Sequence, residues 1–466
     1  MKFLILSIFS FSVLAGYNTA NSLLRKRMNY DQKLKLLVDN LVEDGLYYSS
    51  IPWIKEYLVR GRAGYDSSFE KNFSKVLKVA GTAQFETLPV RFLKRSKLNT
   101  VKYILGKKLI KNGDYNLAQQ YLNSVNSNHS IFPFAANALA TSYSVSGNHN
   151  KAIIAYNQCV NSSQSAISSS NSNLENNQLK KNKDYCTLGV ARTLFSARKY
   201  KEADLKYLDI PKSSPVWPFV LFDEAWNSYY LKNYNRTLGK LVTYKAPIFD
   251  KFFNPEFDVL KALSYLKMCL YSDAKEVSDN FYKTYMSRTR KLRLFLRSKG
   301  KNYNYYYRLY TDFNKRSTTG NTLLDSLLDS FATDGAIENL QSQLEVSYKE
   351  YATVKYLKKN RLRRSLLNNL KEVVKTQRIL IGSYVRSRLI EKYAELYRGF
   401  EGMSYIKLEV LSQRKAKLYN FKENNNKKRG DIKYLERNEK QYFWNFNGEF
   451  WADELGDYVF ALRSEC

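Results

Sequence analysis

The residue types used in catalysis do not fall into a recognisable catalytic arrangement in this chain. It has only two histidines, His129 and His149, and neither has the spacing of a metal site or of a catalytic triad. No glycine-rich phosphate loop is present. We therefore expect no catalytic residue, no metal site and no cofactor, and we expect the chemistry of this chain to be binding.

The four cysteines lie in different settings. Cys159 and Cys186 flank a Ser/Asn-rich stretch, residues 161–183. They either form a disulfide that pins the ends of this stretch or remain two buried thiols, because the sequence does not give the separation of their Cα atoms. Cys269 is predicted to lie in the core, and Cys466 is predicted to be a terminal thiol.

Aromatic and cationic side chains recur on the first helices of a series of predicted helix pairs, which line a concave groove. Large rigid aromatics anchor peptide segments, and Lys107 and Arg192 are suited to bind a carboxylate. The candidate partner-binding residues are Tyr103, Lys107, Lys111, Asn137, Tyr185, Arg192, Phe222, Trp226 and Tyr230. The alternative is that the C-terminal helices fill the groove, in which case these residues belong to the core.

A second candidate surface is strongly basic. Residues 287–308 contain no acid, and their tyrosines alternate with Lys and Arg in a mixture that suits phosphate backbones or anionic head groups. The candidate anionic-surface residues are Arg288, Arg290, Arg293 and Arg297. The alternative is a solvated helix face.

The C-terminal segment combines aromatic and acidic residues. Trp444, Trp451, Glu449 and Asp453 are of the types found in sugar-binding sites. The favoured interpretation is an acidic amphipathic segment that docks by its aromatics onto a basic body.

The elements that must position these residues are helix pairs at a fixed spacing. A small residue marks the second helix of each pair, and the first and second markers, like the third and fourth, are 34 residues apart. The markers are Ala118, Ala152, Ala203, Thr237 and Ala274, and small residues also recur twelve positions before each, at Gly106, Ala140, Ala191, Ala225 and Ala262. A period of 34 with helix–turn–helix patterning is the tetratricopeptide signature. Residues 98–285 are therefore predicted to form five such repeats, and an ordinary amphipathic helical bundle is the alternative.

The segments on either side are also predicted to be helical. Residues 21–97 are expected to form capping helices, residues 286–441 a basic region of long helices with a break near residues 399–402, and residues 442–466 a short aromatic and acidic segment. Residues 161–183 are expected to be a mobile spacer, since they cannot bury enough apolar surface to order themselves. The predicted fold class is thus all-α, a tetratricopeptide-type solenoid followed by long helices.

Residues 1–20 are predicted to be a secretory signal peptide. Lys2 precedes an apolar run, and small residues follow at Ala15, Gly16 and Ala20. The run is too short to span a bilayer, and no later stretch is long enough; a retained anchor is the alternative. Residues 13–16 resemble the start of a bacterial lipobox, but Tyr17 stands where acylation needs Cys. We therefore expect a soluble exported protein.

The net charge of +32 and the pI near 9.7 favour anionic partners. Acidic lipid head groups and acidic wall polymers are such partners. Nucleic acid is disfavoured, because the compartment that receives exported proteins holds little of it.

Two stretches resemble a narrower group of proteins. They are residues 210–226, IPKSSPVWPFVLFDEAW, and residues 444–456, WNFNGEFWADELG. Together they are similar to exported tetratricopeptide proteins of predatory and gliding deltaproteobacteria, some of which are lipoproteins linked to the gliding-motility machinery. The resemblance implies a place in the periplasm or cell envelope of a Gram-negative bacterium.

The sequence therefore predicts a non-catalytic exported scaffold that holds other envelope proteins in a motility or surface-assembly complex. Direct binding of an anionic wall polymer or lipid through the basic surface is the alternative. A wall-lytic transglycosylase is a remote third, because the C-terminal half lacks the glycine-rich motifs of a lysozyme-like domain.

Overall fold

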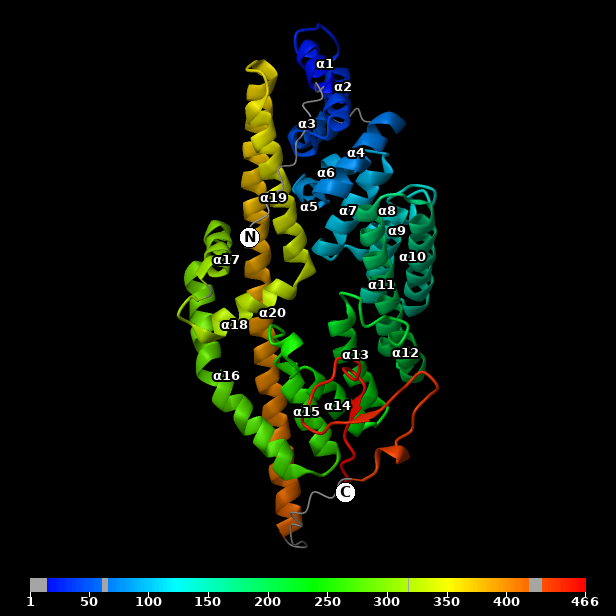
Figure 1. The fold of residues 1–466 in the computed structure, drawn as a ribbon, viewed down its shortest axis with the longest axis vertical. Helices are drawn as coiled ribbons and strands as arrows, with labels where there is room; N and C mark the ends of the chain where they lie inside the picture. The colour runs from blue at the N-terminus through cyan, green and yellow to red at the C-terminus, as the bar shows by residue number, and fades with distance from the viewer. Residues whose placement is uncertain (1–14, 61–65, 317, 419–429) are drawn as a thin grey trace, which may run out of the picture. The chain divides into compact units, whose positions relative to one another are not determined.

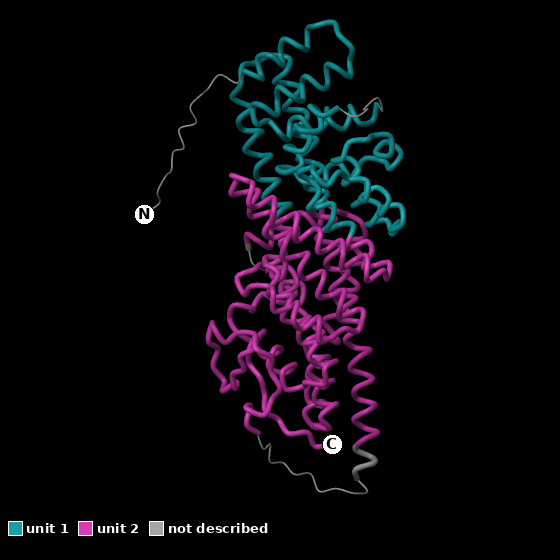
Figure 2. The backbone as a smooth tube through the Cα atoms, turned by 90° about the vertical axis from the view of Figure 1, so that its right-hand side faces the viewer, with its two compact units in different colours: residues 1–139, 339–380 teal, residues 140–338, 381–466 magenta. Residues whose placement is uncertain are grey.

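The structure is a computed structural model that describes residues 15–60, 66–316, 318–418 and 430–466. These residues are almost entirely helical and follow one another as packed helix pairs (Figure 1), which confirms the predicted all-α helical solenoid. They divide into two compact units, shown in Figure 2. Unit 1 comprises residues 1–139 and 339–380, and unit 2 comprises residues 140–338 and 381–466.

Unit 1 begins with short helices. They are α1 (Ala15–Leu23), α2 (Tyr30–Glu43), α3 (Tyr47–Arg60), α4 (Ser67–Ala80), α5 (Ala83–Glu86), α6 (Val90–Leu93), α7 (Asn99–Asn112) and α8 (Tyr115–Asn123). Helix α9 (Phe132–Val145) spans the boundary between the units. Helix α19 (Gly335–Tyr356) and the first part of α20 (Arg361–Leu418) complete unit 1.

Unit 2 continues the series of pairs and ends in an extended segment. Its helices are α10 (His149–Ser169), α11 (Asn173–Ser196), α12 (Tyr200–Tyr207), α13 (Trp217–Tyr230), α14 (Tyr234–Thr243), α15 (Glu256–Lys267), α16 (Tyr271–Lys299), α17 (Tyr303–Arg316) and α18 (Thr322–Ser330), with 3-10 turns η1 (Pro247–Phe249), η2 (Phe331–Thr333) and η3 (Ile432–Tyr434). Two parallel strands of two residues each, β1 (Trp444–Asn445) and β2 (Tyr458–Val459), lie in the C-terminal segment.

The small residues predicted to mark the pairs are all buried. The five markers on the second helices and the four alanines on the first helices have no exposed surface. Gly106 is also buried, and a Cβ atom built on it would lie 2.4 Å from Cγ of Leu122. The two helices of a pair therefore approach closely where these residues meet.

The turn inside each pair has the same backbone conformation in all five pairs. One residue in each turn lies in the left-handed region: Gly113, Gly147, Arg198, Lys232 and Cys269, with φ between 58° and 85°. The next residue then donates its N–H to the carbonyl five residues earlier, as in Asp114 to Leu109 and Leu270 to Tyr265. This is the Schellman geometry that ends a helix, and it repeats at the spacing of the marker residues.

Residues 161–183 do not form the mobile spacer that was expected. They extend α10 and α11 into a long antiparallel pair that turns at residues 170–172. The sulfur atoms of Cys159 and Cys186 are bonded across this pair, and Asn182 Nδ2 donates to Ser163 Oγ at 3.0 Å. Polar residues form helix here because the neighbouring helix supplies partners for their buried groups.

Two expected boundaries are wrong. The break near residues 399–402 is absent, because α20 runs through it. Gly399 and Gly402 instead let α20 pack closely, since a Cβ on Gly399 would lie 2.7 Å from Cζ of Phe281. The predicted end of the repeats at residue 285 lies inside α16, which continues to Lys299.

Helix α19 is attached to the start of α3 by a buried carboxylate. Glu350 accepts hydrogen bonds from the amides of Tyr48 and Ser49 and from the Ser49 hydroxyl, at 2.6 to 2.8 Å. Burial raises the pKa of Glu350, and these bonds only partly offset the effect. The C-terminal helices of unit 1 are thus fixed to its N-terminal helices by charge-assisted bonds.

The predicted signal peptide lies mostly outside the described residues. Residues 15–20 are described, and they form the first part of α1. Among the described helices, none combines the length and the apolar character needed to cross a membrane.

The repeated left-handed turn predicts opposite changes in the free energy of unfolding for two substitutions. We expect Gly147→Ala to lower the free energy of unfolding by about 1 kcal/mol, because alanine is strained in the left-handed region. Lys232→Gly is expected to raise it by a few tenths to about 1 kcal/mol, for the same reason. Urea unfolding of the purified variants measures both.

Gly335→Ala is the matched control, because its φ is not positive and, as at Gly147, no atom lies within 4 Å of the added Cβ. Equal effects at residues 147 and 335 would show that the turn carries no backbone strain.

Candidate functional site

The most prominent side-chain cluster in unit 2 is aromatic. The rings of Tyr200 and Tyr230 stack with centroids 5.1 Å apart, and Phe195 meets both rings edge-on at 5.5 Å. Trp226 and Tyr229 continue the cluster along α13. Tyr230 is 48% exposed, so the cluster opens to solvent where α11 and α13 meet the helices that follow them.

Three of the predicted groove residues of unit 2 lie as follows. Trp226 and Tyr230 lie together, and Tyr185 is 46% exposed on α11. Phe222 is half-buried, as Trp226 is, and its ring packs 5.0 Å from that of Phe257. It points inward because α13 buries one face against α14 and α15.

Arg192 does not present a free guanidinium to a partner. Its Nε lies 2.7 Å from Oδ2 of Asp223. Burial raises the pKa of the Asp223 carboxyl, and the guanidinium of Arg192 only partly offsets that effect. A partner carboxylate would therefore have to share the Arg192 guanidinium with Asp223.

The candidate residues of unit 1 form an internal ion cluster. Lys107 and Lys111 both pair with Glu86, and Lys107 also donates to Thr82 Oγ1 at 2.8 Å. Burial alone would raise the pKa of Glu86, but the two ammonium groups outweigh it and hold that pKa below its ordinary value. Tyr103 is buried beneath Lys107, and its place in the predicted groove is wrong.

Asn137 is half-buried on α9. Of the nine predicted groove residues, Tyr185 and Tyr230 are the exposed aromatics, and the half-buried rings of Phe222 and Trp226 lie in the same unit.

The C-terminal segment docks on unit 2 through its aromatics, as the favoured interpretation of its sequence predicted. Phe446, Phe450 and Tyr458 pack against a cluster that includes Trp217 and Phe249. A Cβ on Gly239 would lie 1.8 Å from the Tyr458 carbonyl oxygen, so the segment's backbone lies directly on α14. Trp444 and Trp451 remain exposed.

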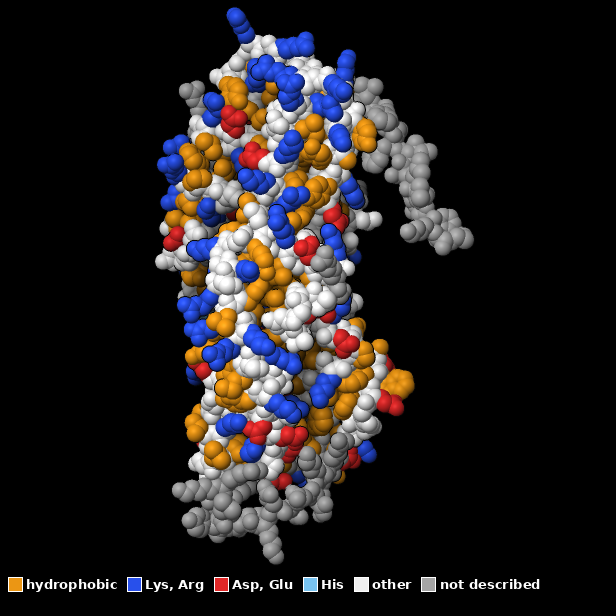
Figure 3. Space-filling model, turned by 90° about the vertical axis from the view of Figure 1, so that its left-hand side faces the viewer, with side chains coloured by type: hydrophobic (Ala, Val, Ile, Leu, Met, Phe, Trp, Pro, Cys, Tyr) orange, Lys and Arg blue, Asp and Glu red, His pale blue; other side chains and the backbone are white. Residues whose placement is uncertain are grey.

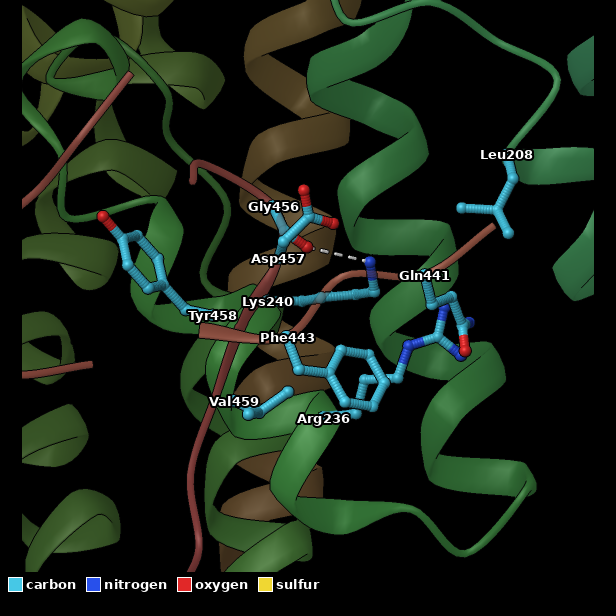
Figure 4. Close-up of a pocket in the computed structure, with 9 residues that line it drawn as sticks. All are labelled: Leu208, Arg236, Lys240, Gln441, Phe443, Gly456, Asp457, Tyr458 and Val459. Carbon is cyan, nitrogen blue, oxygen red and sulfur yellow. Dashed lines mark hydrogen bonds between the residues drawn. The ribbon is translucent and has the colours of Figure 1, made fainter. Parts of the chain in front are cut away.

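Buried charges lie under this segment. Arg236 donates to both carboxylate oxygens of Asp204 at 2.8 and 3.0 Å, and Gln441 donates to Asp204 from the segment. Lys240 lies 2.9 Å from Glu224 Oε2 and donates to the carbonyl of Gly456 at 3.1 Å (Figure 4). Buried charges are tolerated only when paired in this way.

The last residues are also held covalently. Cys466 is bonded to Cys269, in the turn between α15 and α16. The predictions of a core thiol at Cys269 and a free terminal thiol at Cys466 are therefore wrong. The segment brings Cys466 back to the turn, where the Glu465 amide donates to the Met268 carbonyl. No pattern in the sequence relates two cysteines so far apart.

The four candidate arginines lie on α16 and are all exposed. Within the described residues, no carboxylate forms an ion pair with any of them. Figure 3 shows Lys and Arg side chains spread over one face of the molecule, with fewer Asp and Glu side chains among them. The basic surface is thus available to an anionic partner.

No protein family and no curated protein sequence matches this chain. Among solved structures, it is similar to a circular tandem repeat protein with novel repeat topology and enhanced subunit contact surfaces. Sequence identity is 14%, the match covers 86% of this chain and 90% of that chain, and the TM-score is 0.15. The evidence that this chain is a helical repeat protein is therefore the series of helix pairs described above.

The ion cluster of unit 1 predicts a pH dependence. Glu86→Gln is expected to lower the free energy of unfolding at neutral pH by about 1 kcal/mol. Because the pKa of Glu86 is lower in the folded state than its unfolded value of about 4.3, its contribution is present above that pH. The contribution is lost as the pH falls through the folded pKa, so the variant should lose less stability in acid.

Urea unfolding at a series of pH values from neutral into acid measures this difference. Glu345→Gln, at an exposed position of α19 in the same unit, is the control and should leave the curve unchanged. A Glu86→Gln curve parallel to that of the unsubstituted protein would contradict the prediction.

The buried charges of unit 2 predict a large effect. Lys240→Met leaves Glu224 buried without its ammonium partner, and we expect a loss of about 3 to 5 kcal/mol. Lys212→Met removes the exposed pair with Asp457 and should cost less than about 1 kcal/mol. Chemical denaturation measures both losses in the free energy of unfolding. Similar losses would show that the buried pair contributes no more to stability than the exposed pair.

Proposed function

We propose that this chain is a non-catalytic scaffold that binds other proteins through the aromatic cluster of unit 2. The main observation in favour of this proposal is the cluster itself, in which Tyr230 is half exposed on a framework of packed helices. Exposed aromatics on rigid elements supply large contact area at low entropic cost. A helical repeat fold is consistent with such a role.

The docked C-terminal segment supports this proposal. Helices α12 and α14 already hold an extended stretch of chain. The side-chain amide of Asn235 bonds to the backbone of Leu462, and the ammonium of Lys240 bonds to the carbonyl of Gly456. The same kinds of contact would serve a peptide from a partner.

The finer parts of the proposal come from the sequence. The spacing of 34 residues supports tetratricopeptide repeats, and the predicted signal peptide supports export. The resemblance to deltaproteobacterial envelope proteins supports a place in a periplasmic motility or surface-assembly complex. Within this proposal the partners are envelope proteins, and no cofactor takes part.

A second candidate function is binding of an anionic wall polymer or lipid. The observation that favours it is the row of exposed arginines on α16, which have no acidic neighbour in an ion pair among the described residues. Such binding would be driven by charge and therefore weakened by salt.

One experiment separates the two functions. Tagged protein is cross-linked in cells of the source bacterium, and the products are identified by mass spectrometry after fractionation of the envelope. Tyr230→Ala is expected to lower recovery of specific envelope proteins about tenfold, the effect of losing an aromatic hot spot. Replacing the four arginines by Gln should leave that recovery nearly unchanged.

Tyr356→Ala is the matched control, because Tyr356 is 80% exposed on α19 outside the cluster. Circular dichroism establishes that each variant is folded. The opposite result is that the tagged protein is recovered with wall polymer or lipid alone, that 0.5 M salt (about the level at which surface charges are screened) releases it, and that the arginine variant is not recovered. That result would contradict the scaffold and favour the second function.

A further inference from the structure

The first described residues of α1 lie against an acidic side chain. The amides of Gly16 and Tyr17 both donate to the carboxylate of Asp44, the Gly16 bond measuring 3.1 Å. The first amides of a helix have no acceptor within it, and a carboxylate near a helix N-terminus is stabilising. Asp44 thus holds the amides of Gly16 and Tyr17 in the first described turn of α1.

Gly16 lies too close to α2 for any side chain. A Cβ atom built on it would lie 2.2 Å from the carbonyl oxygen of Asn40 and 2.9 Å from Cγ of Asp44. Both contacts are with groups that cannot move away cheaply, because the carbonyl is backbone and the carboxylate is held by two amides. Glycine at position 16 is therefore required by the packing of α1 on α2.

The residues after Gly16 belong to the core of unit 1. Tyr17 is 3% exposed, and its hydroxyl bonds to the Lys358 carbonyl at 3.1 Å and to Asn360 at 2.9 Å. Ala20 has no exposed surface, and Leu23 is buried. Removing residues 16–20 would open a gap between α1, α2 and the turn before α20.

The sequence offers two small-residue sites for removal of the predicted leader, after Ala15 and after Ala20. Peptidases of exported proteins favour small residues at the last and third-last positions of the leader. Ala15 and Ala20 each supply the last position, with Val13 and Asn18 respectively at the third-last. Cutting after Ala20 discards Tyr17 and its anchoring bonds. Cutting after Ala15 keeps every contact described above.

We propose that the chain is processed between Ala15 and Gly16, and that Asp44 receives the new N-terminus. Water hydrolyses this peptide bond, the leader departs with a carboxylate on Ala15, and the Gly16 nitrogen becomes an amine that takes up a proton. The ammonium group then replaces an amide beside Asp44, so an ion pair between two charged groups replaces a hydrogen bond from a neutral donor to the carboxylate. This inference depends on the export that forms part of the proposed function.

The first test is the N-terminus of the full-length chain expressed in a Gram-negative host. Periplasmic protein is purified by a C-terminal tag and analysed by intact mass and N-terminal sequencing. A mature chain that begins at Gly16 is the expected result. Export with a chain that begins at Asn21, or that keeps the leader, overturns the inference and leaves export standing. Protein found only in the cytoplasm overturns both.

The second test asks whether Asp44 faces the new amine. The mature protein is treated briefly near neutral pH with an amine-reactive ester, and labelling of the N-terminal peptide is followed by mass spectrometry. Asp44→Asn is expected to speed labelling of the Gly16 amine severalfold, because an ammonium paired with a carboxylate gives up its proton less readily. A merely structural role for Asp44 would not change this reactivity while the fold is kept.

Glu43→Gln is the matched control, because Glu43 is exposed and next to Asp44 in the sequence. It should label at the rate of the unsubstituted protein. Circular dichroism establishes that both variants are folded. Equal labelling rates in the Asp44 and Glu43 variants would then contradict the pairing of the Gly16 amine with Asp44.

Discussion

The fold depends on the close approach of two helices within each pair. A side chain larger than a methyl group would separate them at Ala191 or Ala225, and the left-handed turn residue sets the angle at which the second helix returns. Because both constraints act inside a pair, each pair is a local unit that stacks on the next. The aromatic cluster follows from this arrangement, since Tyr200 and Tyr230 come from consecutive pairs and stack only when the pairs do.

The sequence predicted what depends on local spacing. The marker residues, the all-helical class and the docking of the tail by its aromatics all follow from patterns within a few tens of residues. Residues 161–183 were misjudged because their helicity comes from packing across the Cys159–Cys186 pair. Gly399 and Gly402 were predicted to break a helix because the sequence does not show what packs against a glycine. In the structure Gly399 faces Phe281 and Gly402 faces Val259.

The candidate site was harder to predict, because exposure depends on what the rest of the chain covers. Lys107 and Arg192 have the right chemistry for a partner carboxylate, but Glu86 and Asp223 already occupy them. Acids are scarce in this chain, and several are used inside it, among them Asp204, Glu224 and Glu350. These acids do not neutralise the exposed arginines of α16. Internal pairing of the acids therefore makes the surface more basic.

The bond between Cys269 and Cys466 has a mechanical consequence. It joins residues 197 positions apart, and so makes the last two fifths of the chain a closed covalent ring. A pulling force applied at the two ends of the polypeptide passes through this bond and bypasses everything inside the ring. The backbone of helices α16 to α20 lies inside the ring and is outside the covalent path of the force, which reaches these helices only through contacts such as those of Glu350 with Tyr48 and Ser49. The backbone of the basic helix α16 is thus not itself pulled when the two ends of the chain are loaded.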